Sequence, residues 1–276
     1  MIIDCNVIRE SILFEVKEEV DKLGFAPTLA IITCSHDEPS QIYVRNKIKT
    51  AEQVGIKAVH YNLEPSNFEN TEQLAEFVTN MNEKANAIIV QLPLDPKFDE
   101  KVITECVMTN RDVDGLTEIN VAKLVDGDKD AIVPATAQAA YVIISTVYGG
   151  DLSHMDVTVV NRSKLIGKPL QSLLTNHNAT VTMCHSKTNS VMIKTFNADI
   201  VVVGIGKPNY FDKHYFSMTK TQLVIDCGIS RVDGKLYRDV DPEIDRKNIL
   251  LANKVGVITT ACLMQNVIKC TKLQNK

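Results

Sequence analysis

Short apolar runs alternate along the chain with longer segments in which apolar residues recur every three or four positions. The runs are rich in β-branched residues, which is typical of strands buried on both faces. Because helical patterns separate them, the order predicts βαβ units and mainly parallel sheets. The predicted strands are 28–34, 57–63, 86–94, 156–160, 179–184, 198–204 and 222–228.

These strands fall into two sets, which predicts an α/β fold with two lobes. Between the sets, a helical pattern ends at Gly149 and Gly150, a pair typical of a helix stop. The chain of 276 residues also reaches the length at which a single core stops growing, about 250 to 300 residues. The pattern leaves open whether the last predicted helix, 258–272, closes the second sheet or returns to the first.

Composition and charge exclude several classes of protein. The chain is 45% hydrophobic and 23% charged, and no apolar run approaches the roughly 20 residues that span a membrane. A net charge of −4 with scattered lysines offers no basic patch for nucleic acid. The seven cysteines lack metal-ligand spacing, which predicts free thiols and no metal site. Without a signal-peptide pattern, we expect a cytoplasmic protein.

Tyr43 and Lys47 lie four residues apart on a predicted amphipathic helix. They fall along one margin of its apolar stripe, whereas Arg45 and Lys49 project toward solvent. This position is compatible with the wall of a cleft. The segment alone favours the alternative, a lysine whose aliphatic stem covers apolar surface. Only other residues can favour the cleft.

The segment from 156 to 173 has the pattern of a strand, a polar turn and a helix. Such a turn directs backbone N–H groups and the positive end of the helix toward an anion. The glycine fingerprint of dinucleotide sites is only partly present, because Asn161 occupies the first small position and the next glycine is Gly167. Asparagine tolerates positive φ, so the turn remains possible.

The end of the next predicted strand favours one cofactor. NAD sites usually carry an acid there for the ribose hydroxyl, but this strand ends in C-H-S-K-T. Donors and positive charge for a 2′-phosphate come instead from His185, Ser186 and Lys187, with Arg162 from the preceding turn. We therefore predict NADP, with NAD less favoured. The alternative is that these are solvated loop residues.

Two polar segments in the first half of the chain are also candidates for a ligand-binding site. Gln91 follows a buried strand, and Asp114 lies in the turn D-V-D-G. Ligands of open α/β sheets bind at the carboxyl ends of strands, where Gln91 is expected. Each also has a structural explanation, as a strand cap or as an Asx turn.

Together these segments resemble the methylenetetrahydrofolate dehydrogenase/cyclohydrolase family. The motifs occur in the family's order and cover most of the chain. They are S-x-x-Y-V-x-x-K from Ser40 to Lys47, V-Q-L-P-L from Val90 to Leu94, D-V-D-G from Asp112 to Gly115, R-S-x-x-x-G-x-P from Arg162 to Pro169, A-T-V-T-x-C-H-S from Ala179 to Ser186, and I-D-C-G-I from Ile225 to Ile229.

The resemblance implies a catalytic lobe made of residues 1–139 and 255–276, so that the last helix crosses back to the first lobe. A Rossmann-type lobe, 140–254, would bind NAD(P), with a folate cleft between the lobes and a homodimer formed by the Rossmann lobes. The implied activity is NADP-dependent oxidation of 5,10-methylenetetrahydrofolate to 5,10-methenyltetrahydrofolate, followed by hydrolysis to 10-formyltetrahydrofolate.

The resemblance also implies residue roles. Lys47 would assist proton transfer in hydrolysis, Gln91 would position and tune it, and Tyr43 would stack near the substrate. Asp114 would hold the pterin, with Leu92 and Gly256 as further substrate contacts. The implied cofactor-binding residues are Asn161, Arg162, Ser163, Gly167, Ser186 and Ile229.

Three segments that would face ligands depart from the family pattern. Residues 134–139 read P-A-T-A-Q-A where the family usually has P-C-T-P-x-G, the loop expected at 249–257 lacks the family's Pro-Gly-rich sequence, and Asn161 replaces a glycine. Two alternatives therefore stay open. One is a non-catalytic or partly active family member with a binding or regulatory role. The other is a two-lobe hydroxy-acid dehydrogenase with Lys47 and Asp114 as acid and base.

Overall fold

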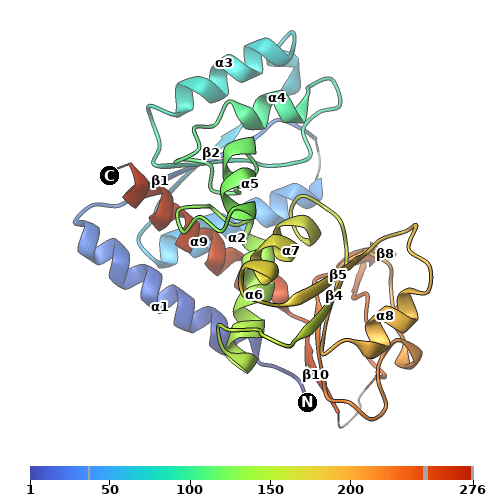
Figure 1. Ribbon diagram of the computed structural model, residues 1–276. Coiled ribbons are helices and arrows are strands. Elements are labelled where there is room, and N and C mark those ends of the chain that lie inside the picture. Colours follow the sequence, from blue (N-terminus) through green and yellow to red (C-terminus); the bar gives the residue numbers. More distant parts are fainter. Residues whose placement is uncertain (37, 245–247, 275–276) are drawn as a thin grey trace. The chain divides into compact units, whose positions relative to one another are not determined.

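The structure is a computed structural model that describes residues 1–276 except 37, 245–247 and 275–276 (Figure 1). Its internal contacts divide the chain into two compact units. The N-terminal unit comprises Glu10–Pro134 and Thr260–Lys276, and the C-terminal unit comprises Met1–Arg9 and Ala135–Thr259. The predicted division had two crossings, at 139/140 and 254/255. The contacts give three, at 9/10, 134/135 and 259/260, so residues 1–9 fall in the other unit from the one expected.

The N-terminal unit contains a three-stranded parallel sheet in the order β2-β1-β3. The strands are β1 (Thr28–Thr33), β2 (Lys57–Asn62) and β3 (Ala87–Val90). The prediction of parallel strands in these three segments is confirmed. The third strand is shorter than predicted and ends at Val90. Beyond it, the Gln91 N–H donates to the Ile32 carbonyl (2.8 Å) and the Asp95 N–H donates to the Cys34 carbonyl (2.8 Å), but Pro93 between them has no N–H to donate, so the ladder is interrupted.

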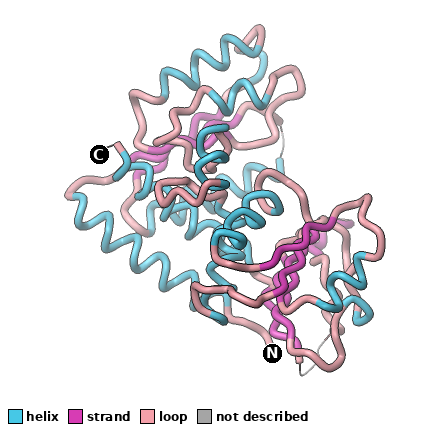
Figure 2. The backbone as a smooth tube through the Cα atoms, in the orientation of Figure 1, coloured by secondary structure: helices cyan, strands magenta, loops and turns pink. Residues whose placement is uncertain are grey.

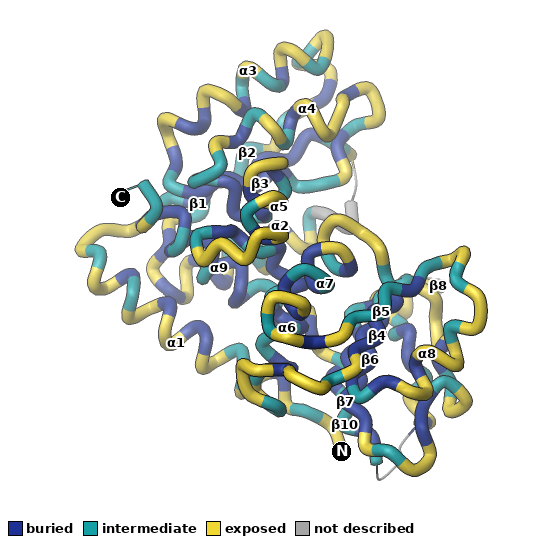
Figure 3. Tube along the Cα trace, in the orientation of Figure 1, coloured by how far each residue is buried: buried dark blue, intermediate teal, exposed yellow. Residues whose placement is uncertain are grey.

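Amphipathic helices accompany this sheet. In α3, the buried residues Leu74, Val78 and Met81 recur at helical spacing, and Figure 3 shows buried and exposed positions alternating along the helix. The unit boundaries fall inside α1 and α9. The helices are α1 (Cys5–Leu23), α2 (Glu38–Gln53), α3 (Thr71–Met81), α4 (Glu100–Glu105), α5 (Glu118–Val125) and α9 (Val255–Leu273), with a 3₁₀ turn η1 (Pro65–Asn67).

The C-terminal unit is built on a five-stranded parallel sheet, in the order β10-β7-β6-β4-β5. Figure 2 shows strands in magenta. The two strands β6 and β7 are buried along their whole length, as their apolar sequences predict. The strands are β4 (Asp156–Val160), β5 (Thr180–Cys184), β6 (Ile200–Val203), β7 (Gln222–Asp226) and β10 (Ile249–Ala252).

The remaining elements connect these strands. As predicted, α6 ends just before Gly149, which has a φ of 87° and donates its N–H to the Ser145 carbonyl (2.9 Å). The connecting elements are α6 (Ala135–Tyr148), α7 (Gly167–Asn176), α8 (Val191–Asn197), the 3₁₀ turn η2 (Lys213–Tyr215), and an antiparallel hairpin of β8 (Ser230–Val232) and β9 (Lys235–Tyr237).

The strand β10 corrects the expectation of a loop over 249–257. Four residues there pair with β7 on one side. On the other side, Met1 and Ile3 bond to Leu251, which explains why the first residues group with the C-terminal unit. No helix among the described residues has the length and apolar character needed to cross a membrane.

Candidate functional site

Lys47 and Gln91 are in direct contact in the N-terminal unit. Lys47 lies on α2, Gln91 is the first residue after β3, and Nζ of Lys47 donates a 2.7 Å hydrogen bond to Oε1 of Gln91. Nε2 of Gln91 donates to the Leu92 carbonyl (2.8 Å), so the amide presents its oxygen to the lysine. Gln91 therefore orients the amine without supplying a charge that would stabilise the ammonium.

The environment of Lys47 changes its proton affinity. Burial lowers the pKa of the Lys47 amine, and the Asp114 carboxylate opposes that shift. Burial raises the pKa of Asp114 to about 6, while Lys47 lowers it and Asp112 raises it further. In both groups, loss of hydration is the largest cause. A shifted amine beside a shifted carboxylate is typical of functional sites and suits proton transfer near neutral pH.

The turn that carries Asp114 is fixed by buried hydrogen bonds. Oδ2 of Asp112 accepts from the Thr117 N–H (2.8 Å) and from Nδ2 of Asn120 (2.9 Å). Asn266, on α9, donates to the carbonyls of Val113 (2.9 Å) and Val133 (2.8 Å). Sequence reasoning missed Asn266, although a buried amide in a largely apolar helical stretch needs hydrogen-bond partners and is a signal for such a role.

Gly115 closes this turn and offers a test of its rigidity. Its φ is 65°, and an added Cβ would lie 2.2 Å from the Ile132 carbonyl oxygen. We expect Gly115→Ala to lower the free energy of unfolding by about 3 kcal/mol, because backbone must shift in addition to the unfavourable φ. Urea unfolding measures the loss.

Gly149→Ala provides the matched control, since Gly149 also has positive φ but no atom lies within 4 Å of its added Cβ. Gly149→Ala should lower the free energy of unfolding by only about 1 kcal/mol. Equal losses in the two variants would show that the close approach to Ile132 is unimportant.

Tyr43 and Leu92 border the same group of residues. Tyr43 lies one turn before Lys47 on α2 and is 51% exposed, so its ring is available to stack on a flat ligand. Leu92 is half-buried and follows Gln91 directly. The structure thus brings Lys47, Gln91, Leu92 and Asp114 together, with Tyr43 on the same helix as Lys47.

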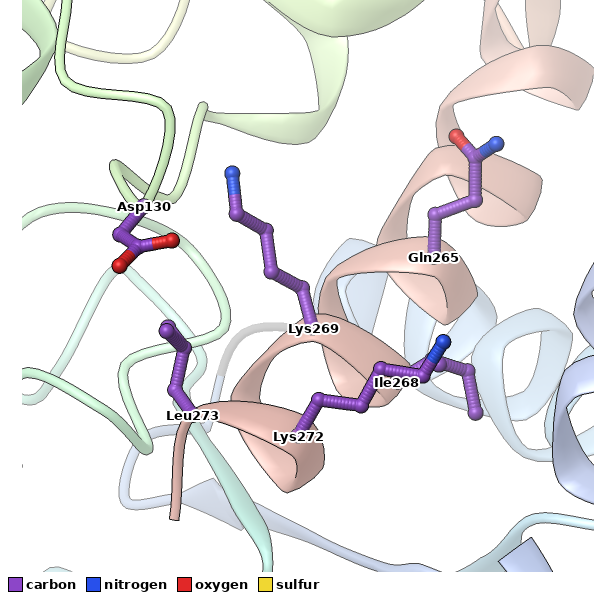
Figure 4. A pocket seen from close by; sticks show the side chains of 6 residues that line it. All are labelled: Asp130, Gln265, Ile268, Lys269, Lys272 and Leu273. Atoms are coloured by element: carbon purple, nitrogen blue, oxygen red, sulfur yellow. The ribbon is translucent and has the colours of Figure 1, made fainter. Parts of the chain in front are cut away.

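A cavity of about 340 Å³ lies elsewhere in this unit and contains none of the predicted site residues. Its two lysines already have partners: Nζ of Lys269 donates to the Ala131 carbonyl (2.6 Å), and Lys272 pairs with Glu19. We assign it no role. Its lining, shown in Figure 4, is Asp130, Gln265, Ile268, Lys269, Lys272 and Leu273.

The predicted cofactor residues of the C-terminal unit lie at one edge of its sheet. Asn161 follows β4, Ser186 comes shortly after β5, and Ile229 comes shortly after β7. Because these strands are parallel, their carboxyl ends share an edge. Arg162, Ser163, Ser186 and Ile229 are all exposed there.

Asn161 and Gly167 shape the turn between β4 and α7. Oδ1 of Asn161 accepts from the N–H groups of Ser163 (2.7 Å) and Gly167 (3.0 Å), and Nδ2 donates to the Gly204 carbonyl (2.5 Å). An added Cβ on Gly167 would lie 2.0 Å from the Asn161 carbonyl oxygen, so only glycine fits there. Ser163 also belongs to the turn, because its Oγ accepts from the Ile166 N–H (3.1 Å), whereas the exposed Arg162 lies beside these bonds.

Asp239 holds the loops at this edge of the sheet by hydrogen bonds, a role that sequence reasoning missed. Its buried carboxylate accepts from the N–H groups of Ile205 (2.5 Å), Gly206 (3.0 Å) and Lys207 (2.8 Å), directly after β6. It also packs against Gly228, where an added Cβ would lie 2.1 Å from its carboxyl carbon. Asp239 therefore fixes the loops after β6 and β7 together. No motif signalled it, because its partners are backbone groups distant in sequence.

Gly256 does not group with the Lys47 site. It is the second residue of α9, is exposed, and belongs to the C-terminal unit. An added Cβ would meet no atom within 4 Å, so its local fold does not require glycine.

Comparison with known proteins decides the family. The sequence profile of the tetrahydrofolate dehydrogenase/cyclohydrolase catalytic domain matches residues 3–114. The profile of the NAD(P)-binding domain of tetrahydrofolate dehydrogenase/cyclohydrolase matches residues 134–275. The chain belongs to the tetrahydrofolate dehydrogenase/cyclohydrolase family. Two-lobe hydroxy-acid dehydrogenases are thereby excluded as its family.

Relatives agree with this assignment over the whole length. The chain is 37% identical to the bifunctional protein FolD of Thermotoga petrophila over 281 residues, covering 100% of both chains. It is also 36% identical to the bifunctional protein FolD of Rickettsia typhi over 282 residues, covering 98% of this chain and 97% of the relative.

Solved structures of family members have the same fold. The bifunctional methylenetetrahydrofolate dehydrogenase/cyclohydrolase FolD of Campylobacter jejuni aligns with a TM-score of 0.91 at 30% identity, covering 99% of each chain. The methylenetetrahydrofolate dehydrogenase-cyclohydrolase of Trypanosoma brucei, complexed with NADP and an inhibitor, aligns with a TM-score of 0.90 at 30% identity, covering 100% of this chain and 98% of that one.

Proposed function

We propose that this chain is an NADP-dependent methylenetetrahydrofolate dehydrogenase and methenyltetrahydrofolate cyclohydrolase. The observation that carries the proposal is the 2.7 Å contact of the Lys47 amine with Gln91, in a setting where burial lowers the pKa of Lys47. Family membership over the whole chain supplies the substrate class. The N-terminal unit is the folate-binding catalytic domain, and the C-terminal unit binds the cofactor.

The residues of the C-terminal unit fit NADP. Exposed donors surround the turn after β4 and the end of β5, and the β5 end carries Ser186 and Lys187 instead of the acid that NAD sites use. Arg162, Ser163 and Ser186 would hold the 2′-phosphate, with Ile229 near the nicotinamide. When bound, the cofactor supplies the hydride acceptor for oxidation of the one-carbon bridge.

Hydrolysis depends on residues of the N-terminal unit. Loss of a hydride leaves the methenyl carbon as part of a cation, and an ammonium beside it would be repelled. Lys47 therefore acts as a neutral amine, oriented by Gln91, and takes a proton from the water that attacks this carbon. Addition of the water opens the bridge to 10-formyltetrahydrofolate and releases one proton.

The remaining substrate contacts follow from the same site. Asp114, as a carboxylate, accepts hydrogen bonds from the pterin. Tyr43 stacks on the folate, and Leu92 makes an apolar contact. As a cytoplasmic homodimer, the protein would supply one-carbon units for purine biosynthesis.

One assay tests the proposal. Purified protein receives methylenetetrahydrofolate and NADP, and the absorbances of reduced cofactor and of the methenyl compound are followed together. We expect the absorbance of the reduced cofactor to rise, and we expect added methenyltetrahydrofolate to be hydrolysed. If the protein binds folate but neither reaction occurs, the chain is a non-catalytic family member and the proposal is wrong.

A further inference from the structure

The strand β3, which Gln91 follows, also pairs with the segment that leads into Asp114. The Ile88 N–H of β3 donates to the Arg111 carbonyl (2.7 Å), and the Ile88 carbonyl accepts from the Val113 N–H (3.3 Å). One strand therefore carries both connections. The positions of Gln91 and Asp114 are set against the same stretch of backbone.

Asn266 holds the other side of this segment. It lies on α9, is only 5% exposed, and donates from Nδ2 to the carbonyls of Val113 (2.9 Å) and Val133 (2.8 Å). The Val113 carbonyl belongs to the planar peptide group that joins Val113 to Asp114. Asn266 thus fixes the plane from which the backbone of Asp114 continues.

A buried amide at this point of α9 has a cost that apolar packing would avoid. Its neighbours on the helix, Leu263, Met264 and Val267, are buried and apolar. A buried polar side chain lowers stability unless its hydrogen bonds are made, and when they are made it orients its partners. The two carbonyls are the groups that Asn266 orients.

Asp114 needs such a constraint, because its charge is disfavoured where it lies. Burial and Asp112 raise the pKa of the half-buried Asp114 to about 6, and Lys47 opposes them. A carboxylate in this setting gains free energy when it turns toward water. The backbone before Asp114 must therefore be held if its carboxylate is to stay beside Lys47.

We propose that Asn266 is a positioning residue for folate binding. By donating to the Val113 carbonyl, it holds Asp114 at the place beside Lys47 where the carboxylate meets the pterin. Asn266 acts through the backbone of Asp114 and does not itself contact the substrate. The inference rests on the proposed function, which makes Asp114 the acceptor for the pterin.

The first test needs no ligand. Carbon NMR of protein labelled at its aspartate carboxyls follows the titration of Asp114, and Asp114→Asn identifies the signal. In Asn266→Leu, a side chain of similar size removes both donors, so Asp114 relaxes toward water. Its pKa is expected to fall from about 6 toward the ordinary range of an aspartate.

The second test measures folate affinity. The ligand is 5-formyltetrahydrofolate, a stable reduced folate, and its Kd is determined by titration calorimetry at pH 7. We expect Asn266→Leu to raise this Kd about fivefold, because the acceptor for the pterin is no longer held in place. If Asn266→Leu does not fold, Asn266→Ser takes its place, since serine is too short to reach both carbonyls.

A double-mutant cycle and a matched control separate positioning from general damage. In the Asp114→Asn background, Asn266→Leu should change the Kd by less than about twofold, because the positioned carboxylate is already gone. Asn248 also donates to two backbone carbonyls, those of Ser217 (2.7 Å) and Lys220 (2.9 Å), but in the C-terminal unit. Asn248→Leu should change neither the pKa of Asp114 nor the Kd.

The inference is overturned if Asn266→Leu leaves the pKa of Asp114 or the Kd unchanged. It is also overturned if the Kd rises as much in the Asp114→Asn background as in the parent protein. Either result with a parent protein that binds folate leaves the proposed function intact. A parent protein that binds no folate contradicts the proposed function, whereas the titration of Asp114 still decides whether Asn266 holds it.

Discussion

Replacing Lys47 with methionine is expected to reduce hydrolysis of methenyltetrahydrofolate at least about 100-fold while some hydride transfer remains. Proton transfer by a positioned side chain contributes about that factor or more, and methionine retains the apolar stem without the amine. Hydride transfer needs the rings positioned but no base at this carbon. Following the absorbances of reduced cofactor and methenyl compound in one reaction measures both steps, and the methenyl compound should accumulate.

The control is Lys49→Met, on the same helix. Lys49 is exposed and projects away from the apolar stripe, so its loss should change neither step by more than about twofold. Equal loss of both activities in Lys47→Met, with folate binding intact, would contradict the role of Lys47 as the base for water.

The affinity for folate is expected to fall in acid because of Asp114. Burial raises the pKa of this carboxyl to about 6, so lowering the pH through that value protonates it and removes an acceptor for the pterin. For a single group of this pKa, the KM for methylenetetrahydrofolate in the dehydrogenase step should rise about tenfold between pH 7 and pH 5. A pH series of initial rates measures this change.

Asp114→Asn should show a raised KM, by about tenfold or more, that no longer depends on pH in this range. Asp126→Asn, at an exposed position after α5, should keep the original KM and pH profile. If the pH dependence persists in Asp114→Asn, another group titrates and the carboxylate does not hold the folate.

The sequence predicted most strands and helices because the order of apolar and polar residues within a segment indicates which of its faces are buried. Apolar runs such as those of β6 and β7 are strands covered on both faces, and the spacing in α3 places its apolar residues on one side. The segment of β10, Ile249–Ala252, is also an apolar run, but four residues are too few to identify a strand by pattern alone. It becomes a strand only because β7 and the first residues of the chain supply partners for its backbone.

By itself, the sequence determined two α/β units and their parallel sheets, since the strand and helix periods show in the local order of apolar and polar residues. It also supplied the motifs around Lys47, Asp114 and Arg162, on which the proposed site is based. Only the tertiary structure decided that Gln91 bonds to Lys47, that Asn161 bridges β4 and β6, and that Asp239 joins two loops. These contacts join residues far apart in the chain, and hydrogen bonds to backbone groups leave no pattern in the side chains.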